Sequence, residues 1–128
     1  MTTPRPQTTD IAADVLGALA AHRAIVPFSH TVPQLDLDQA YAVTAELRRR
    51  RIDRGETAVG RKIGFTNPGI WAEYDVSAPI WGDMYASTVH RLDGTFALSA
   101  LMEPRIEPEI VFRLATAVGP GMTPEQLL

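Results

Sequence analysis

Apolar residues recur at helical spacing in the first part of the chain. A capping residue, Thr9 or Asp10, precedes them, and the pattern ends near Arg23. The apolar side chains that share one face are Ile11, Val15, Leu16 and Leu19. This spacing predicts an amphipathic helix that buries the stripe.

A second helical pattern begins after a connector over residues 24–37. Asp36 or Asp38 is the predicted start, and Gly55 marks the end. The predicted buried positions are Ala40, Tyr41, Val43, Ala45, Leu47 and Ile52. Four arginines at 48–51, together with Arg54, resemble an anion site, but cations also suit the C-terminal end of a helix dipole. We interpret them as a solvated face.

From residue 57 the pattern changes to the alternation of a strand. Residues 57–66 place Val59, Ile63 and Phe65 on one face, and Lys62 on the other between Gly60 and Gly64. Flanking glycines remove bulk and let a ligand or another backbone approach the lysine. The alternative is a surface lysine on an edge strand.

Shorter elements are predicted after this strand. Asn67-Pro68-Gly69 is a turn signal, and residues 70–74 fit one helical turn. Residues 84–92 can be extended, and Asp93-Gly94 then predicts a hairpin turn into residues 95–101. Helices followed by strands indicate an α+β protein.

Two carboxylates stand two residues apart in the strand-like run 104–112. Glu107 and Glu109 would share one face, about 6–7 Å apart, with apolar side chains on the other. The apolar positions are Ile106, Ile110 and Phe112. The two charges repel unless a cation lies between them, and Mg²⁺ prefers carboxylate oxygens. The alternative is a solvated acidic face on an edge strand.

Composition limits the class of protein. The chain has 128 residues, 45% hydrophobic and 21% charged, which suits one domain with or without a small appendage. Its net charge of −3 indicates neither nucleic-acid nor membrane affinity. Cysteine is absent, so disulfides and thiol nucleophiles are excluded, and a cytoplasmic location is expected by default. Lys62 is the only lysine among twelve basic residues.

The chain ends at an apparent helix start. Thr123 can cap a helix, Pro124 suits the first helical position, and Gln126 can complete a capping box. The sequence stops at Leu128, before a stable helix could form. We therefore expect that the chain is truncated at the beginning of a helix.

Several motifs together resemble a known enzyme family. They are Gly60-Arg61-Lys62-Ile63-Gly64-Phe65-Thr66, Pro79-Ile80-Trp81-Gly82 and Ile106-Glu107-Pro108-Glu109-Ile110-Val111-Phe112, with Ile25-Val26-Pro27-Phe28 and Asp38-Gln39-Ala40-Tyr41 upstream. The combination resembles the 2-keto-4-pentenoate hydratase and 4-oxalocrotonate decarboxylase group of the fumarylacetoacetate hydrolase superfamily. The resemblance covers nearly all of this chain but only the N-terminal half of a typical member.

The resemblance implies an architecture in two regions. Residues 1–56 would be an N-terminal helical region, and residues 57–128 the first part of a mixed β-roll catalytic domain. The full-length form would be a homo-oligomer, with no nucleic-acid or membrane partner.

The resemblance also implies a site. Glu107 and Glu109 would bind Mg²⁺ or Mn²⁺, with a third carboxylate ligand supplied from beyond Leu128. Lys62 would be catalytic, with its pKa lowered by the cation and by burial. The residues implied to contact the substrate are Gly64, Phe65 and Thr66.

The implied reaction is metal-dependent hydration of 2-hydroxy-dienoic or 2-oxo acids from aromatic ring cleavage. Decarboxylation of a 2-oxo acid is the alternative within the family. C–C hydrolysis of an acylpyruvate is a further alternative and would need a His–Glu pair, for which His30 and Glu46 are candidates. A truncated, non-enzymatic relic or binding module is the contrasting class. Because the third ligand is missing, we expect the chain by itself to be inactive or poorly folded.

Overall fold

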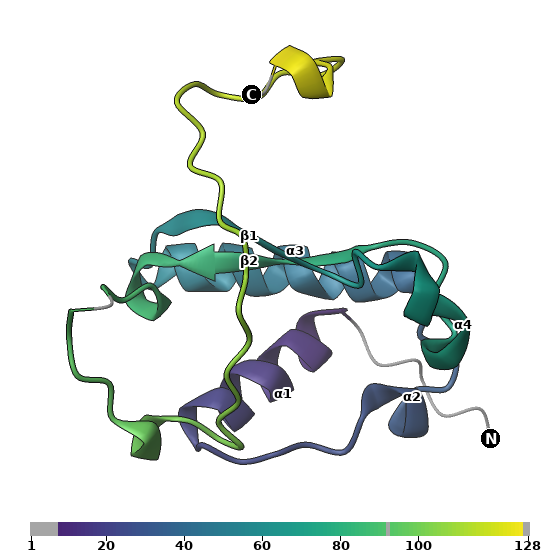
Figure 1. Ribbon diagram of the computed structural model, residues 1–128. Coiled ribbons are helices and arrows are strands. Elements are labelled where there is room, and N and C mark those ends of the chain that lie inside the picture. The colour runs from purple at the N-terminus through teal and green to yellow at the C-terminus, as the bar shows by residue number, and fades with distance from the viewer. Residues whose placement is uncertain (1–7, 92, 127–128) are drawn as a thin grey trace.

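The computed structural model describes residues 8–91 and 93–126. It shows helices on one side of a small antiparallel sheet (Figure 1). The helices are α1 (Thr8–Ala20), α2 (Phe28–Thr31) and α3 (Leu37–Asp53). Three parts of the chain lie outside this description, namely residues 1–7, Leu92 and residues 127–128. They include the outer ends of both predicted regions.

Helix α3 begins and ends where the sequence predicts. The Gln39 backbone N–H donates to the Asp36 carboxylate at 2.8 Å, and the Asp36 N–H donates to the Gln39 side chain at 3.2 Å. This capping box satisfies two backbone donors that the helix leaves free. After the helix, Gly55 has a φ of +91°, which a residue without a Cβ adopts readily.

A small hydrophobic core joins the helices. The buried side chains at its centre are Ile11, Ala12, Val32 and Val43, with Phe28, Leu35 and Leu47 packed around them. Leu16 of the predicted α1 stripe is also buried. Leu19 and Ile52 were expected inside but are 47% and 44% exposed. Helical spacing defines a common face, but burial also requires a second element to cover it.

The two strands form one antiparallel pair. Strand β1 (Ala58–Gly64) confirms the strand predicted from alternation, and β2 (Ile80–Tyr85) is its partner. The register places Lys62 opposite Gly82, and it shifts between Ala58 and Gly60. The face carrying Val59 and Ile63 remains about half exposed.

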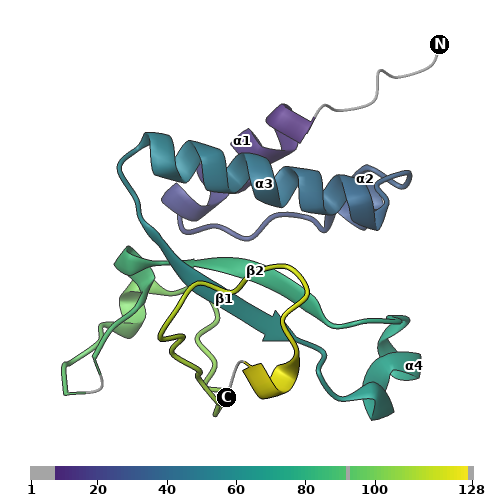
Figure 2. The same ribbon diagram turned by 90° about the horizontal axis from the view of Figure 1, so that it is seen from above.

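The sheet separates the helices from the C-terminal segment. Figure 2 shows α1 and α3 on one side of β1 and β2 and the C-terminal segment on the other. On the helical side, Arg48 of α3 donates to Asp83 of β2 at 2.8 Å. Next to this ion pair, the rings of Tyr41 and Trp81 stack with centroids 5.1 Å apart. These contacts orient the opposite face of β1 toward the C-terminal segment.

The link between the strands contains the predicted helical turn. A 3-10 turn, η1 (Pro68–Ile70), continues directly into α4 (Trp71–Tyr74). The Asn67 side chain accepts a hydrogen bond from the Gly69 N–H at 2.9 Å, which begins the turn.

The predicted second hairpin is wrong. Strand β2 ends in the 3-10 turn η2 (Ala86–Thr88), and residues 95–101 contain η3 (Leu98–Ala100) in place of a strand. The Thr88 hydroxyl donates to the Tyr85 carbonyl at 2.9 Å, so local side-chain bonding ends the extended run early. The turn at residues 93–94 is present but does not connect two strands.

The C-terminal helix signal produces a short turn. Element η4 (Pro124–Gln126) begins as predicted, because the Thr123 N–H donates to the Gln126 side chain at 2.8 Å. Helices and a sheet together confirm the α+β class, while the larger β-roll remains a prediction. Within residues 8–91 and 93–126, no helix has the length and apolar character needed to span a membrane.

Candidate metal and lysine site

Lys62 lies on an open face of strand β1. Gly60 and Gly64 flank it along the strand, and Gly82 stands opposite it on β2. A Cβ atom at Gly60 or Gly82 would meet no other heavy atom within 4 Å. The glycines therefore leave the lysine side chain free space on this face, as the sequence predicts for a ligand-accessible position.

The structure brings Lys62 together with both predicted carboxylates. Its ammonium Nζ lies 3.1 Å from Glu107 Oε2 and donates a hydrogen bond to Glu109 Oε1. The three side chains are 51%, 64% and 47% exposed, in the order Lys62, Glu107 and Glu109. One cation thus bridges two acidic groups from a distant part of the chain.

The acidic pair lies on an extended segment that crosses the sheet (Figure 1). Residues 104–114 form no strand in the described structure, so that prediction is wrong. The two glutamates reach Lys62 from one side of the segment, as the predicted shared face requires, and Ile106 and Ile110 are 96% and 84% exposed. A strand requires an aligned neighbouring backbone, and here the segment meets the sheet through side chains.

The two carboxylates raise the pKa of Lys62. The hydrogen bond that Lys62 donates to Glu109 has the larger effect, and the hydrogen bond to Glu107 adds to it. Both favour the charged ammonium. The sequence interpretation expected a lowered pKa, caused by burial and a bound cation. Lys62 is half exposed, so the carboxylates determine the direction in this arrangement.

The donor set of this site fits a hard divalent cation. Glu107 and Glu109 already converge on one positive group, so their oxygens can approach a common centre. Mg²⁺ is commonly held by one or two carboxylates and completes its shell with water. The described residues contain no cluster of three or more acidic, histidine or cysteine ligands. The described residues could therefore supply two carboxylate ligands, and other ligands or water would have to complete the shell.

The three residues predicted to contact substrate lie at the end of β1. Gly64 pairs with Ile80, and the exposed Thr66 follows the strand. Phe65 has a φ of +54°, and its carbonyl accepts a hydrogen bond from the Trp71 indole at 2.7 Å. This contact fixes the backbone directly after the lysine strand. Substrate contact by Gly64, Phe65 and Thr66 remains a prediction.

The His–Glu pair required for acylpyruvate hydrolysis is not assembled in the described structure. Glu46 accepts hydrogen bonds from Arg49 and Arg50 of its own helix, at distances of 2.6–2.8 Å. These two guanidinium groups lower the pKa of Glu46 to about 2. A carboxylate held in this way is a weak base, and no contact links it to His30.

The arginine-rich end of α3 is neutralised within the chain. Arg48 pairs with Asp83, Arg49 and Arg50 pair with Glu46, and Arg51 donates to Glu56 at 2.8 Å. Arg48 and Arg49 are 45% and 59% exposed, in agreement with the predicted solvated face, while Arg50 and Arg51 are about one quarter exposed. The cluster thus supports the helix and its joint with the sheet.

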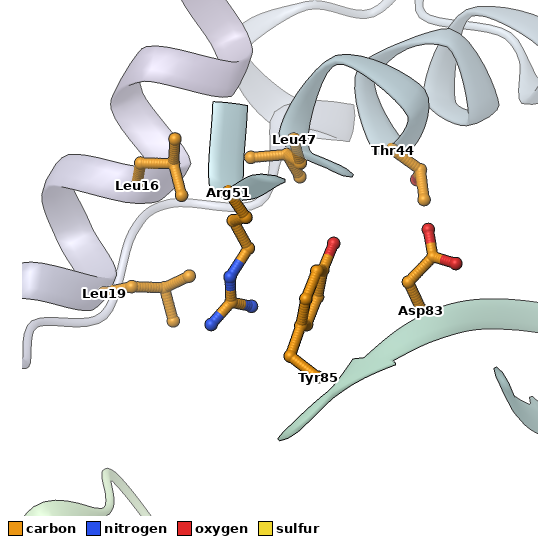
Figure 3. A pocket seen from close by; sticks show the side chains of 7 residues that line it. All are labelled: Leu16, Leu19, Thr44, Leu47, Arg51, Asp83 and Tyr85. Atoms are coloured by element: carbon orange, nitrogen blue, oxygen red, sulfur yellow. The ribbon is translucent and has the colours of Figure 1, made fainter. Parts of the chain in front are cut away.

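A hollow at the joint of α1, α3 and β2 contains several polar groups (Figure 3). The residues that line it are Leu16, Leu19, Thr44, Leu47, Arg51, Asp83 and Tyr85. The Arg51 guanidinium lies 4.0 Å from the Tyr85 ring centroid, and Asp83 is paired with Arg48. Its charged groups are therefore already matched, and we assign the hollow to helix–sheet packing.

Gly82 and Asp83 are site-supporting residues that the sequence interpretation missed. Gly82 leaves space opposite Lys62, and Asp83 anchors the same strand to α3. Their roles depend on the register between β1 and β2. The family motif Pro79-Ile80-Trp81-Gly82 contains Gly82, but no local pattern placed that glycine opposite Lys62.

Sequence comparison relates the chain to enzymes. No protein-family model matches the chain. The chain is 34% identical over 110 residues to a 2-keto-4-pentenoate hydratase of Paraburkholderia xenovorans, covering 85% of this chain and 41% of that protein. It is 36% identical over 102 residues to a 4-oxalocrotonate decarboxylase of a Pseudomonas species, covering 75% of this chain and 40% of that protein.

Structural comparison gives the same group. A 4-oxalocrotonate decarboxylase from Pseudomonas putida, complexed with magnesium and adipate, superposes with a TM-score of 0.61 at 30% sequence identity. The match covers 67% of this chain and 33% of that chain. The same enzyme complexed with calcium and acetate has a TM-score of 0.62.

These matches confirm the resemblance that the motifs predict. The chain is a relative of the 2-keto-4-pentenoate hydratases and 4-oxalocrotonate decarboxylases. It spans about two fifths of the length of the curated relatives that it matches.

Proposed function

We propose that this chain carries the metal-binding and lysine portion of a hydratase site for 2-hydroxy-dienoic or 2-oxo acids. The observation that supports this most directly is the convergence of Glu107 and Glu109 on Lys62 across an open sheet face. The convergence joins three residues that the family motifs single out. The related hydratases provide the reaction class.

The proposed roles follow from the chemistry of the side chains. Glu107 and Glu109 would hold Mg²⁺ or Mn²⁺, which when bound supplies Lewis-acid polarisation of a 2-oxo acid. Lys62 would stabilise the enolate by charge and transfer a proton at Nζ. An arginine cannot release a proton at neutral pH, so lysine suits this position. Gly60 and Gly82 keep the approach to Nζ open.

Decarboxylation is the second candidate function. It is supported by the related decarboxylase sequences and by the magnesium-containing decarboxylase structure that this chain resembles. Both reactions use the same activation of a 2-oxo acid, so Lys62 and the carboxylates serve either one. The two reactions are distinguished by product.

A chimera tests the proposed function despite the partial match to the relatives. This chain would replace the matching region of the Paraburkholderia xenovorans hydratase. We expect Mg²⁺- or Mn²⁺-dependent loss of dienol absorbance with a 2-hydroxydienoate, and loss of that activity in the Glu107→Gln chimera. CO₂ release from 4-oxalocrotonate identifies the decarboxylase alternative.

The chimera experiment includes a matched control. Glu103→Gln removes one exposed carboxylate from the same part of the chain without touching the Lys62 contacts. Absence of both reactions from a folded chimera, or activity that is equal in the Glu107→Gln and Glu103→Gln forms, would contradict the proposal. Activity of the unmodified 128-residue chain would overturn the expectation that it is inactive alone.

A further inference from the structure

The Lys62 ammonium occupies the position between the two candidate metal ligands. Nζ lies 3.1 Å from Glu107 Oε2 and donates to Glu109 Oε1. A divalent cation coordinated by the same oxygens would have to enter this space. An ammonium and a divalent cation held on the same two oxygens repel each other, so coordination through Glu107 Oε2 and Glu109 Oε1 requires the ammonium to move away.

We propose that Lys62 is a placeholder for the divalent cation and that metal enters the site by exchange with its ammonium. This inference rests on the metal role proposed above for Glu107 and Glu109. In the described arrangement, the lysine neutralises the repulsion between the carboxylates and holds them at the sheet. When metal binds, the lysine leaves their oxygens and its amine becomes available on the open face.

The surroundings of Lys62 permit this exchange. The ammonium is a compact charge on a flexible four-carbon stem, so it can move away by rotation of its side chain. No heavy atom lies within 4 Å of a Cβ at Gly60 or Gly82, which leaves space beside the stem. The side chain is 51% exposed, so the displaced ammonium can be hydrated.

The single lysine allows a direct test. Acylation of the purified chain with a mild amine reagent modifies only Lys62 and the α-amino group, which is an internal reference. We expect Mg²⁺ to increase the ratio of Lys62 to α-amino modification several-fold, and EDTA to reverse the change. A ratio that is unchanged or lower, under conditions where calorimetry shows Mg²⁺ binding, would overturn the exchange.

Metal affinity gives a second test that does not involve amine reactivity. We expect Lys62→Met to lower the Mn²⁺ dissociation constant by about 2- to 10-fold, the range that corresponds to the loss of exposed competing ion pairs. The charge-matched control is Arg105→Met, because Arg105 lies two residues from Glu107 but forms no ion pair with either glutamate in the described structure. Lys62→Gln is a second, polar replacement.

The outcomes separate the exchange from the proposed function. The placeholder role would be contradicted if the dissociation constant of both Lys62 variants were equal to or higher than that of Arg105→Met, while circular dichroism showed unchanged helical content. That result would not contradict the proposed metal site. Absence of Mg²⁺ and Mn²⁺ binding in the unmodified chain and in every variant would overturn both proposals. Tighter binding together with faster Lys62 modification supports the exchange.

Discussion

The Lys62 ammonium lies 3.1 Å from the Glu107 carboxylate, although strand β1 and the C-terminal segment are far apart in sequence. The same ammonium donates to Glu109, so one cation joins two acidic groups. Repulsion between neighbouring carboxylates makes any such site responsive to cations. This geometry carries the proposed metal role.

Metal should stabilise the folded chain through the acidic pair. At ten times its dissociation constant, Mg²⁺ is expected to add about 1.4 kcal/mol to the free energy of unfolding, because it binds only the folded form. Glu107→Gln and Glu109→Gln should each abolish most of this gain. Thermal unfolding with Mg²⁺ and with EDTA measures it, and Glu103→Gln is the control that should retain it. Equal gains in all the variants would exclude the pair as ligands.

The ion pairs of Glu46 should give stability a distinct pH dependence. Hydrogen bonds from Arg49 and Arg50 lower the pKa of Glu46 from 4.5 to about 2. A lowered carboxyl pKa contributes stability that is fully present above about pH 4.5 and is lost as pH falls toward 2. The difference in urea midpoint between the unmodified chain and Glu46→Gln should therefore shrink across this window.

The two arginines provide the control for the pH effect. Arg49→Met and Arg50→Met should remove pH-dependent stability from the unmodified chain but have no such effect in a Glu46→Gln background. This expectation follows because the arginines stay charged throughout the window. A difference between the chain and Glu46→Gln that is constant from pH 5 to 2 would contradict the assignment.

Two isoleucines should lose very different amounts of stability on the same substitution. Ile11 is 3% exposed within the helical core, whereas Ile106 is 96% exposed on the acidic segment. Ile11→Ala is expected to lower the free energy of unfolding by about 2–5 kcal/mol, and Ile106→Ala by less than about 0.5 kcal/mol. Urea denaturation followed by circular dichroism compares them. A large loss from Ile106→Ala would show that the segment is buried in solution.

The ion pair between Arg48 and Asp83 should stabilise the joint of α3 with the sheet. The Asp83 side chain is only 4% exposed, so Arg48→Met leaves a desolvated carboxylate without this partner. We expect a loss of about 1–3 kcal/mol. Adding Asp83→Asn should recover part of that loss, because the unpaired charge is then removed. A double-mutant cycle measures the coupling, and strictly additive losses would contradict it.

Local patterns predicted much of the fold. The capping signals at Asp36 and Gly55 locate α3, because caps depend on residues that are close in sequence. The alternation around Lys62 likewise locates β1. The hairpin predicted after residue 92 failed, because hydrogen bonds of Thr88 end the preceding strand early. Turn chemistry therefore outweighed the alternating pattern there.

The candidate site was likewise predictable from the sequence only in part. Spacing alone placed Glu107 and Glu109 on one side of their segment and left Lys62 without bulky neighbours. The family motifs joined the three, but no local pattern could show that the segment crosses β1 at the lysine. That crossing depends on how the chain returns after β2, a contact between residues far apart in sequence.

The sequence by itself determined the limits of α3, strand β1 and the α+β class, because these follow from periodicity and capping over a few neighbouring positions. It did not determine α2, which lies within the predicted connector, and the candidate site residues were predicted from the family motifs. Only the tertiary structure decided that Gly82 faces Lys62, that α3 is anchored through Asp83, and that Lys62 neutralises both glutamates. The physical reason is that register and long-range ion pairs depend on the three-dimensional path of the whole chain.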